Sequence, residues 1–100
     1  MNNLSSSQRS YLRSQAHHFE PVVLIGKHGI TDGTIKSIDR VLEARELIKI
    51  KFCEFKGEKL SYSEKITELT NSQVVSVIGH TVIIYRQNPD SDKRQIHIPQ

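Results

Sequence analysis

The sequence predicts a single compact α/β domain with a mixed four-stranded sheet. Segments with the 3.6-residue apolar repeat of amphipathic helices alternate with short β-branched runs, in the order α-β-α-β-α-β-β. The last two runs meet at Gly79 and His80, a two-residue connection that favours a II′ hairpin and therefore an antiparallel pair. The chain has 100 residues, which suits one modest core, and no internal repeat or linker divides it.

The first helix is expected over residues 5–19. Ser5 and Gln8 have the spacing of a capping box, in which each side chain bonds the backbone amide of the other residue. The apolar side chains that follow at helical spacing, and that we expect to face inward, are Leu12, Ala16 and Phe19. Pro21 ends this helix because the residue before a proline is pushed towards extended geometry.

A short strand and a second helix are expected next. Residues 21–25, Pro-Val-Val-Leu-Ile, are wholly apolar, which predicts a strand covered on both faces. After a glycine-containing loop, Thr31 or Asp32 caps a helix that runs to about Ala44. The side chains that form its predicted inward face are Ile35, Ile38, Val41 and Leu42.

Residues 47–55 alternate between apolar and basic side chains, which predicts a strand with one face near solvent. The apolar positions, expected to face the core, are Ile48, Ile50 and Phe52. Lys49 and Lys51 then point to the other face. Cys53 continues the strand pattern, and we expect it to be buried as a small apolar side chain.

The rest of the chain predicts a third helix over 59–70 and two strands, over 73–78 and 81–86. The expected inward side chains of the helix are Tyr62, Ile66 and Leu69. The domain is therefore expected over residues 1–86. The polar segment 87–100 is expected to be a mobile C-terminal tail, in which Ile96 and Ile98 are candidates for a short edge strand.

The charge distribution gives a mild indication of a polyanionic partner. The net charge is +3 and the pI about 9.2. Residues 1–51 carry eight Lys and Arg against five Asp and Glu, whereas residues 52–100 carry six of each. Clustered positive charge is typical of nucleic-acid surfaces, although a solvated face explains so small an excess equally well. The single cysteine excludes an internal disulfide framework, and no secretory leader or membrane span is visible, so we expect a cytoplasmic protein.

Residues 26–29, Gly-Lys-His-Gly, lie where the first strand reaches the surface. We expect Gly26 and Gly29 to adopt positive φ and to allow close approach of another backbone. Gly29 is expected to lead into a helix N-terminus, where free amides favour an anion. Lys27 and His28 add a cation and a hydrogen-bond donor. A G-x-x-G loop that grips the RNA backbone is a feature of KH modules, but an ordinary turn explains two glycines three apart equally well.

Further basic side chains extend the predicted phosphate-binding surface. Arg9, Arg13 and His17 lie four residues apart on the first helix. Phosphate binding is one explanation of this row, and a solvated helix face is the usual alternative. Lys49 and Lys51 either reach RNA or discourage association at a sheet edge, and the sequence does not separate these roles. The candidate RNA-binding residues are Gly26, Lys27, His28, Gly29, Arg9, Arg13, His17, Lys36, Lys49 and Lys51.

The sequence contains no recognisable catalytic or metal-binding constellation. His17 and His18 are adjacent on a helix, so their side chains diverge by about 100° and cannot chelate as an i, i+4 pair does. Cys53 lacks the spacing of a zinc or redox motif, and a Walker-type phosphate loop is absent. We therefore expect neither an enzyme nor a bound metal or cofactor.

Four motifs occur together between residues 4 and 86: A-H-H, I-G-K-x-G-I-T, L-E-A-R-E-L-I-K and V-x-V-I-G-x-T. In this combination the chain resembles the bacterial YhbY proteins, the stand-alone form of the CRM (chloroplast RNA splicing and ribosome maturation) domain. The resemblance implies a fold related to the C-terminal domain of bacterial translation initiation factor 3. It also implies RNA binding through the glycine loop and its basic neighbours, and association with ribosomal RNA in large-subunit precursors. His28 and His80 depart from the residues common at their positions.

The sequence therefore favours a monomeric RNA-binding factor in ribosome assembly, with no DNA or membrane partner. The alternative is a protein-interaction module that binds a ribosomal or assembly protein, through isoleucine-rich strands or Ile96 and Ile98, with RNA contact incidental. Few aromatic side chains are expected on the surface, so we expect recognition of phosphates and shape rather than of base sequence.

Overall fold

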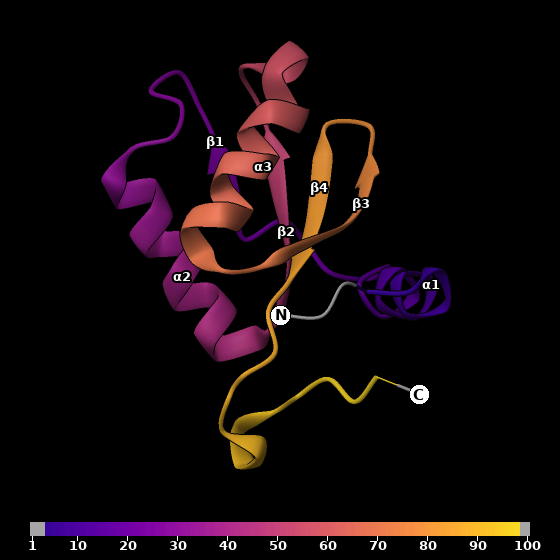
Figure 1. Ribbon diagram of the computed structural model, residues 1–100. Helices are drawn as coiled ribbons and strands as arrows, with labels where there is room; N and C mark the ends of the chain where they lie inside the picture. Colours follow the sequence, from indigo (N-terminus) through magenta and orange to yellow (C-terminus); the bar gives the residue numbers. More distant parts are fainter. Residues whose placement is uncertain (1–3, 99–100) are drawn as a thin grey trace.

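The computed structural model describes residues 4–98, in which three helices pack against a four-stranded sheet (Figure 1). The elements are α1 (Ser6–Gln15), β1 (Val23–Ile25), α2 (Asp32–Arg45), β2 (Leu47–Phe52), α3 (Lys59–Thr70), β3 (Gln73–Ile78) and β4 (Thr81–Tyr85). Two short 3₁₀ turns, η1 (Lys56–Glu58) and η2 (Ser91–Lys93), precede α3 and follow β4. The predicted order of elements and the α/β fold class are confirmed.

The sheet is mixed, with strand order β1-β2-β4-β3. β1 runs parallel to β2, while β4 is antiparallel to both β2 and β3. At the hairpin, Gly79 has φ +60° and His80 is not among the residues of positive φ, which matches a II′ turn. β1 is an edge strand, and Leu24 on it is 62% exposed. The prediction that this strand is covered on both faces is therefore wrong, because Val23 and Ile25 lie in or against the larger core whereas Leu24 faces solvent.

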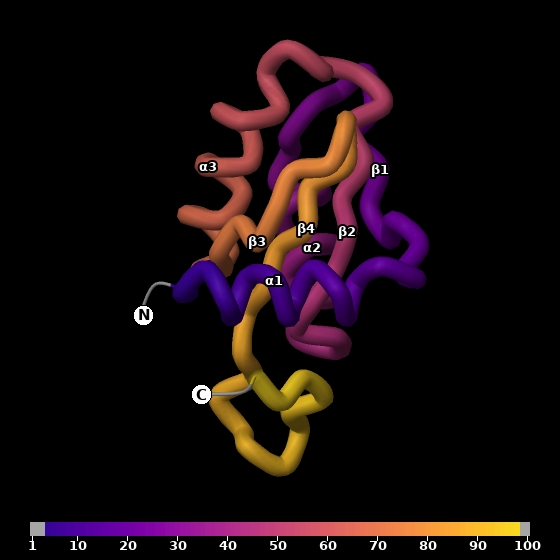
Figure 2. Tube along the Cα trace, turned by 90° about the vertical axis from the view of Figure 1, so that its right-hand side faces the viewer, coloured from indigo at the N-terminus to yellow at the C-terminus, as the bar shows by residue number. Residues whose placement is uncertain are grey.

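The helices cover opposite faces of the sheet, as Figures 1 and 2 show. α2 and α3 enclose the larger core, whose fully buried members include Ile25, Ile38, Leu42, Ile50, Phe52 and Ile66. α1 covers part of the other face, where Leu12 and Ala16 pack with Leu47, Val75, Ile83 and Tyr85. The predicted inward faces of α2 and of strand β2 are confirmed, since both sets of side chains lie in or against the larger core.

Three residues predicted to be buried are exposed. α1 ends at Gln15, before the predicted end, so Phe19 lies beyond the helix and is 39% exposed. Leu69 is 56% exposed, because α3 packs instead through Tyr62, Ile66 and the small polar residues Ser63 and Thr70. Cys53 is exposed because β2 ends at Phe52, after which the chain turns away to donate two backbone hydrogen bonds to the carbonyl of Ile25.

The segment after β4, for which the sequence predicted a mobile tail, packs against the domain over residues 87–98. Asn88 is buried, and Ile96 and Ile98 pack against the core beneath α1. These two isoleucines form no strand in the described part of the chain. Three backbone amides of the segment donate to the carboxylate of Glu46, which is itself fully buried.

Candidate nucleic-acid interface

The loop between β1 and α2 is a tight turn with two basic side chains at its tip. The amide of Gly29 donates to the carbonyl of Gly26 at 3.0 Å, and Lys27 and His28 between them are exposed. Gly29 has φ +65°, and a Cβ there would lie 3.4 Å from the ring of Phe55. Gly26 has open space on its Cβ side and does not have positive φ. The predicted positive φ therefore holds for Gly29 alone, and a side-chain ring rather than a backbone approaches it.

Two backbone amides at the N-terminus of α2, where an anion was predicted to be favoured, bond to side chains of the helix itself. The N-cap is Thr31, two residues beyond Gly29, and its hydroxyl accepts from the amide of Thr34 at 3.1 Å. The hydroxyl of Thr34 in turn accepts from the amide of Thr31 at 3.3 Å. Asp32 adds a negative charge to the first turn. These two amides are therefore not available to an anion, whereas the side chains of Lys27 and His28 are exposed at the loop.

The basic residues of α1 differ in their surroundings. The half-buried guanidinium of Arg9 donates to the carbonyl of Val74 on β3 and so fixes the helix to the sheet. Arg13 is exposed, and His17 lies beyond the end of the helix. Lys49 on β2 donates from Nζ to the carbonyl of His17 at 3.4 Å. α1 thus crosses the sheet from β3 to β2. Of the basic residues predicted to bind RNA from this helix, Arg9 is structural, whereas Arg13 and His17 are exposed.

Strand β2 connects the end of α1 with the glycine loop. Because β2 lies inside the sheet, Lys49 and Lys51 do not protect a sheet edge, and the alternative role left open by the sequence is excluded. Both project on the face that α1 partly covers, about 7 Å apart along the strand. Lys51 is in register with Leu24, two residues before the loop. Lys36 is exposed on α2, on the other side of the sheet, and does not join them.

Three basic residues that were not predicted lie at the same end of the sheet as the loop. The parallel pair β1 and β2 ends there, and the β3–β4 hairpin turns there, since the amide of Phe52 donates to the carbonyl of His80. Lys59 donates to the carbonyl of Gly79, and its Nζ lies 3.4 Å from Nδ1 of His80. Desolvation and the positive charges of Lys59 and Lys56 lower the pKa of His80.

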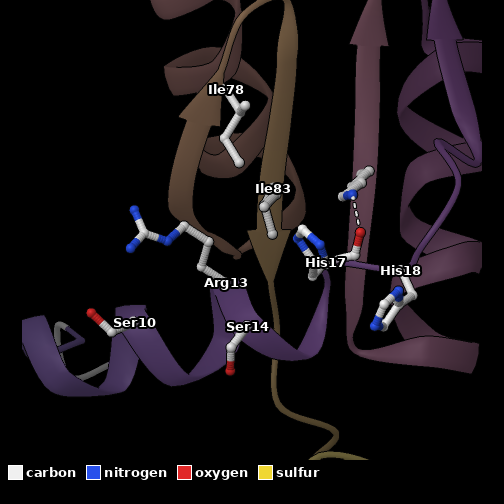
Figure 3. A pocket seen from close by; sticks show the side chains of 8 residues that line it. Ser10, Arg13, Ser14, His17, His18, Ile78 and Ile83 are labelled. Carbon is white, nitrogen blue, oxygen red and sulfur yellow. Dashed lines mark hydrogen bonds between the residues drawn. The ribbon is translucent and has the colours of Figure 1, made fainter.

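A surface pocket of about 510 Å³ lies between the end of α1 and the sheet (Figure 3). It is lined by Ser10, Arg13, Ser14, His17, His18, Lys49, Ile78 and Ile83. A second hollow of about 240 Å³ lies beside it and shares Ser10 and Arg13. We call Arg13, His17, Lys49, Lys51, Lys27 and His28 the basic strip, because β2 joins the helix end to the loop on one face.

Comparison with known proteins identifies the family. The family model described as the CRS1/YhbY (CRM) domain matches residues 4–86. The chain belongs to the CRS1/YhbY (CRM) domain family. The resemblance stated from the four motifs is thereby confirmed. Within the described residues of this CRM domain, no helix is long and apolar enough to cross a membrane. The same residues contain no group of three or more His, Cys, Asp or Glu side chains that could hold a metal ion.

Similar proteins share nearly the whole CRM domain. "Probable RNA-binding protein YqeI" of Bacillus subtilis is 38% identical over 99 residues, which cover 96% of this chain and 99% of that protein. An "RNA-binding protein" of Haemophilus influenzae is 35% identical over 101 residues, which cover 100% of this chain and 99% of that protein. The solution structure of the hypothetical protein SAV1595 from Staphylococcus aureus has 40% identity and a TM-score of 0.80, covering 97% of this chain and all of that one. The first two names describe RNA binding and mention no reaction.

Proposed function

We propose that this CRM domain binds structured RNA through the basic strip. Its four cationic side chains, Arg13, Lys27, Lys49 and Lys51, project from α1, the glycine loop and β2. Within residues 4–98, the side chains of Arg13, Lys27 and Lys51 have no hydrogen bond or ion pair. Cations that are not neutralised by the protein's own carboxylates are available to phosphates, and their contact with RNA releases condensed counterions. This unneutralised charge is the observation that supports the proposal.

The arrangement suits a phosphate backbone that crosses the sheet face from α1 to the loop. Arg13 supplies a fork for bidentate phosphate contact, whereas Lys49, Lys51 and Lys27 act as point charges along the path. At the loop, the open space beside Gly26 lets a sugar–phosphate chain approach the backbone. The names of the relatives support RNA as the ligand.

We further propose that the target is ribosomal RNA in precursors of the large ribosomal subunit, bound by a monomer in the cytoplasm. This part rests on the family resemblance. Crosslinking the protein to cellular transcripts should place most sites in large-subunit precursor RNA. Sites spread evenly over messenger and transfer RNA would contradict this target while leaving RNA binding intact.

A double substitution tests the strip itself. Lys27→Ala with Arg13→Ala should weaken binding of a structured ribosomal RNA fragment and reduce the salt dependence of the affinity by about two phosphate contacts. The matched control is Lys65→Ala with Lys93→Ala, which removes the same charge from exposed positions on α3 and η2. The proposed site is wrong if both double variants remain folded and have the same affinity and salt slope.

The second candidate is a protein-interaction module, favoured by the exposed apolar side chains Leu24 and Ile78 on the sheet. The tail isoleucines no longer support it, because Ile96 and Ile98 are packed against the core beneath α1. Affinity capture before and after nuclease treatment separates the two candidates. Ribosomal proteins that remain bound after nuclease treatment would favour the protein-interaction module.

A further inference from the structure

The pocket between α1 and the sheet combines an apolar floor with a basic rim. The accessible floor is Ile78, 54% exposed at the end of β3, while Ile83 in β4 also lines the pocket but is fully buried. In Figure 3, the ring of His17 lies beside Ile83 and Arg13 lies on the other side, whereas Ser14 and His18 point away. Phosphate contact requires only the cations. The apolar floor therefore needs a separate explanation.

We propose that this pocket holds one unpaired nucleotide of the bound RNA, with its base against the exposed side chains of Ile78 and His17. The inference rests on the proposed RNA-binding function and assigns the class of RNA: a strand with an accessible base, in a loop, a bulge or an end. A base in a duplex has both faces stacked on its neighbours, so only an unpaired base can use this floor. Histidine rings serve as stacking partners for such bases.

The positive charges around the pocket also favour a nucleotide as its occupant. Arg13 and Lys49 both line the pocket, where they can contact the phosphates that flank a docked base. An apolar protein segment would gain from the floor but would leave both cations unmatched. The volume of about 510 Å³ lies within the range of small-ligand pockets, about 300–1,000 Å³.

The pocket is also built on rigid elements. Its floor belongs to the paired strands β3 and β4, since Ile78 is in register with Thr81 and Ile83 with Ser76. The hydrogen bond from Lys49 Nζ to the carbonyl of His17 positions the chain just beyond α1. A base therefore enters a site that already exists in the free protein, at little cost in ordering.

The test compares two RNAs of equal length with Ile78→Ser, a change that removes apolar floor without altering charge. One RNA is a hairpin with an unpaired loop, and the other is the fully paired duplex. The intact protein should prefer the hairpin, and Ile78→Ser should weaken hairpin binding about 5-fold or more while leaving its salt slope and the duplex affinity unchanged. Ile78→Thr, which retains the β-branched shape, should give a smaller loss, and both variants are checked for folding by NMR. Leu60→Ser, at an exposed position on α3, is the control.

The outcomes separate this inference from the proposed function. Equal affinity for hairpin and duplex, with both weakened by the Lys27 and Arg13 double variant, would overturn the base pocket and leave RNA binding in place. No binding of either RNA would overturn both. Loss of a ribosomal protein's binding in Ile78→Ser, with unchanged RNA affinity, would assign the pocket to a protein partner and overturn the inference.

Discussion

One carboxylate oxygen of Glu46 lies 2.6 Å from the backbone nitrogen of Asn88, across the junction between α2 and β2. The other oxygen accepts from the amides of Gln95 at 2.6 Å and Ile96 at 2.9 Å. Glu46 is fully buried and ends α2 with φ +67°. A buried carboxylate needs several donors, and here the C-terminal segment provides them. Residues 87–98 are therefore part of the folded unit.

Replacing this carboxylate should destabilise the protein strongly. Glu46→Ala leaves three backbone amides without their acceptor, and Glu46→Gln places an amide nitrogen where only an acceptor fits. We expect both to lower the free energy of unfolding by roughly 2–4 kcal/mol. Urea denaturation gives this value, with Glu68→Ala on the exposed side of α3 as the control. Equal midpoints for Glu46→Gln and the intact protein would show that the three contacts contribute little.

Truncation after Arg86 should have a similar effect for the same reason. The shortened chain leaves the Glu46 carboxylate buried without its donors and removes Ile96 and Ile98 from the core beneath α1. We expect residues 1–86 to unfold at a clearly lower temperature, with α1 the first element to lose hydrogen-exchange protection. Calorimetry and hydrogen exchange measure both quantities. A truncated chain with unchanged stability would support a domain boundary at residue 86.

The two loop glycines should respond differently to substitution. Gly29→Ala requires an alanine at φ +65° with its Cβ against Phe55, and we expect a loss of about 1–2 kcal/mol of stability. Gly26→Ala meets no atom within 4 Å and should leave stability nearly unchanged. If RNA approaches the backbone at this loop, Gly26→Ala weakens RNA binding without unfolding. Denaturation and RNA titration on the same two variants separate the roles, and equal stability losses would contradict this assignment.

The two arginines of α1 should also differ in their effects on stability and on RNA binding. Arg9→Ala removes the bond to the Val74 carbonyl that joins α1 to β3, and we expect it to lower stability by about 1 kcal/mol. Arg13→Ala should leave stability unchanged and weaken RNA binding, because its side chain is exposed beside the pocket. The check is a pair of denaturation curves with RNA affinities measured on the same samples. A greater stability loss for Arg13→Ala than for Arg9→Ala would be inconsistent with this division.

Local patterns in the sequence predicted most of the fold. The alternation of Ile48, Lys49 and Ile50 predicted the two faces of β2, and the capping box at Ser5 and the cap candidates Thr31 and Asp32 marked two helix starts. These features depend on residues within one turn or one strand of each other. Other features depend on partners distant in sequence. The C-terminal segment, for example, is held by Glu46, about 40 to 50 residues earlier in the chain.

The same distinction applies to the site. Exposure of Lys27 and of Arg13 follows from their positions in a loop and on the polar side of a helix. Lys56, Lys59 and His80 were missed because the charges of the second half balance in number. Only the return of the β3–β4 hairpin to the end of β1 and β2 brings them near the glycine loop.

Alkaline pH should reveal the environment of Tyr85. Burial and the negative charge of Glu46 raise the pKa of its phenol from 10.0 to about 12. The folded protein therefore holds this proton more tightly than the unfolded chain does. The resulting contribution to stability is complete below pH 10 and is lost as the pH rises through about 12.

Tyr85→Phe should remove this part of the pH dependence. Its hydroxyl is buried and has no hydrogen-bond partner among the described residues, so the substitution breaks no bond. We expect the variant to be as stable as the intact protein at pH 7, or more stable by about 1 kcal/mol, and to lose less stability at alkaline pH. Urea denaturation of both proteins at a series of pH values from about 8 to 12 provides the comparison. Parallel curves over that range would show that Tyr85 keeps its proton equally well in the folded and unfolded chains, and a marked loss at pH 7 would reveal a hydrogen bond to its hydroxyl.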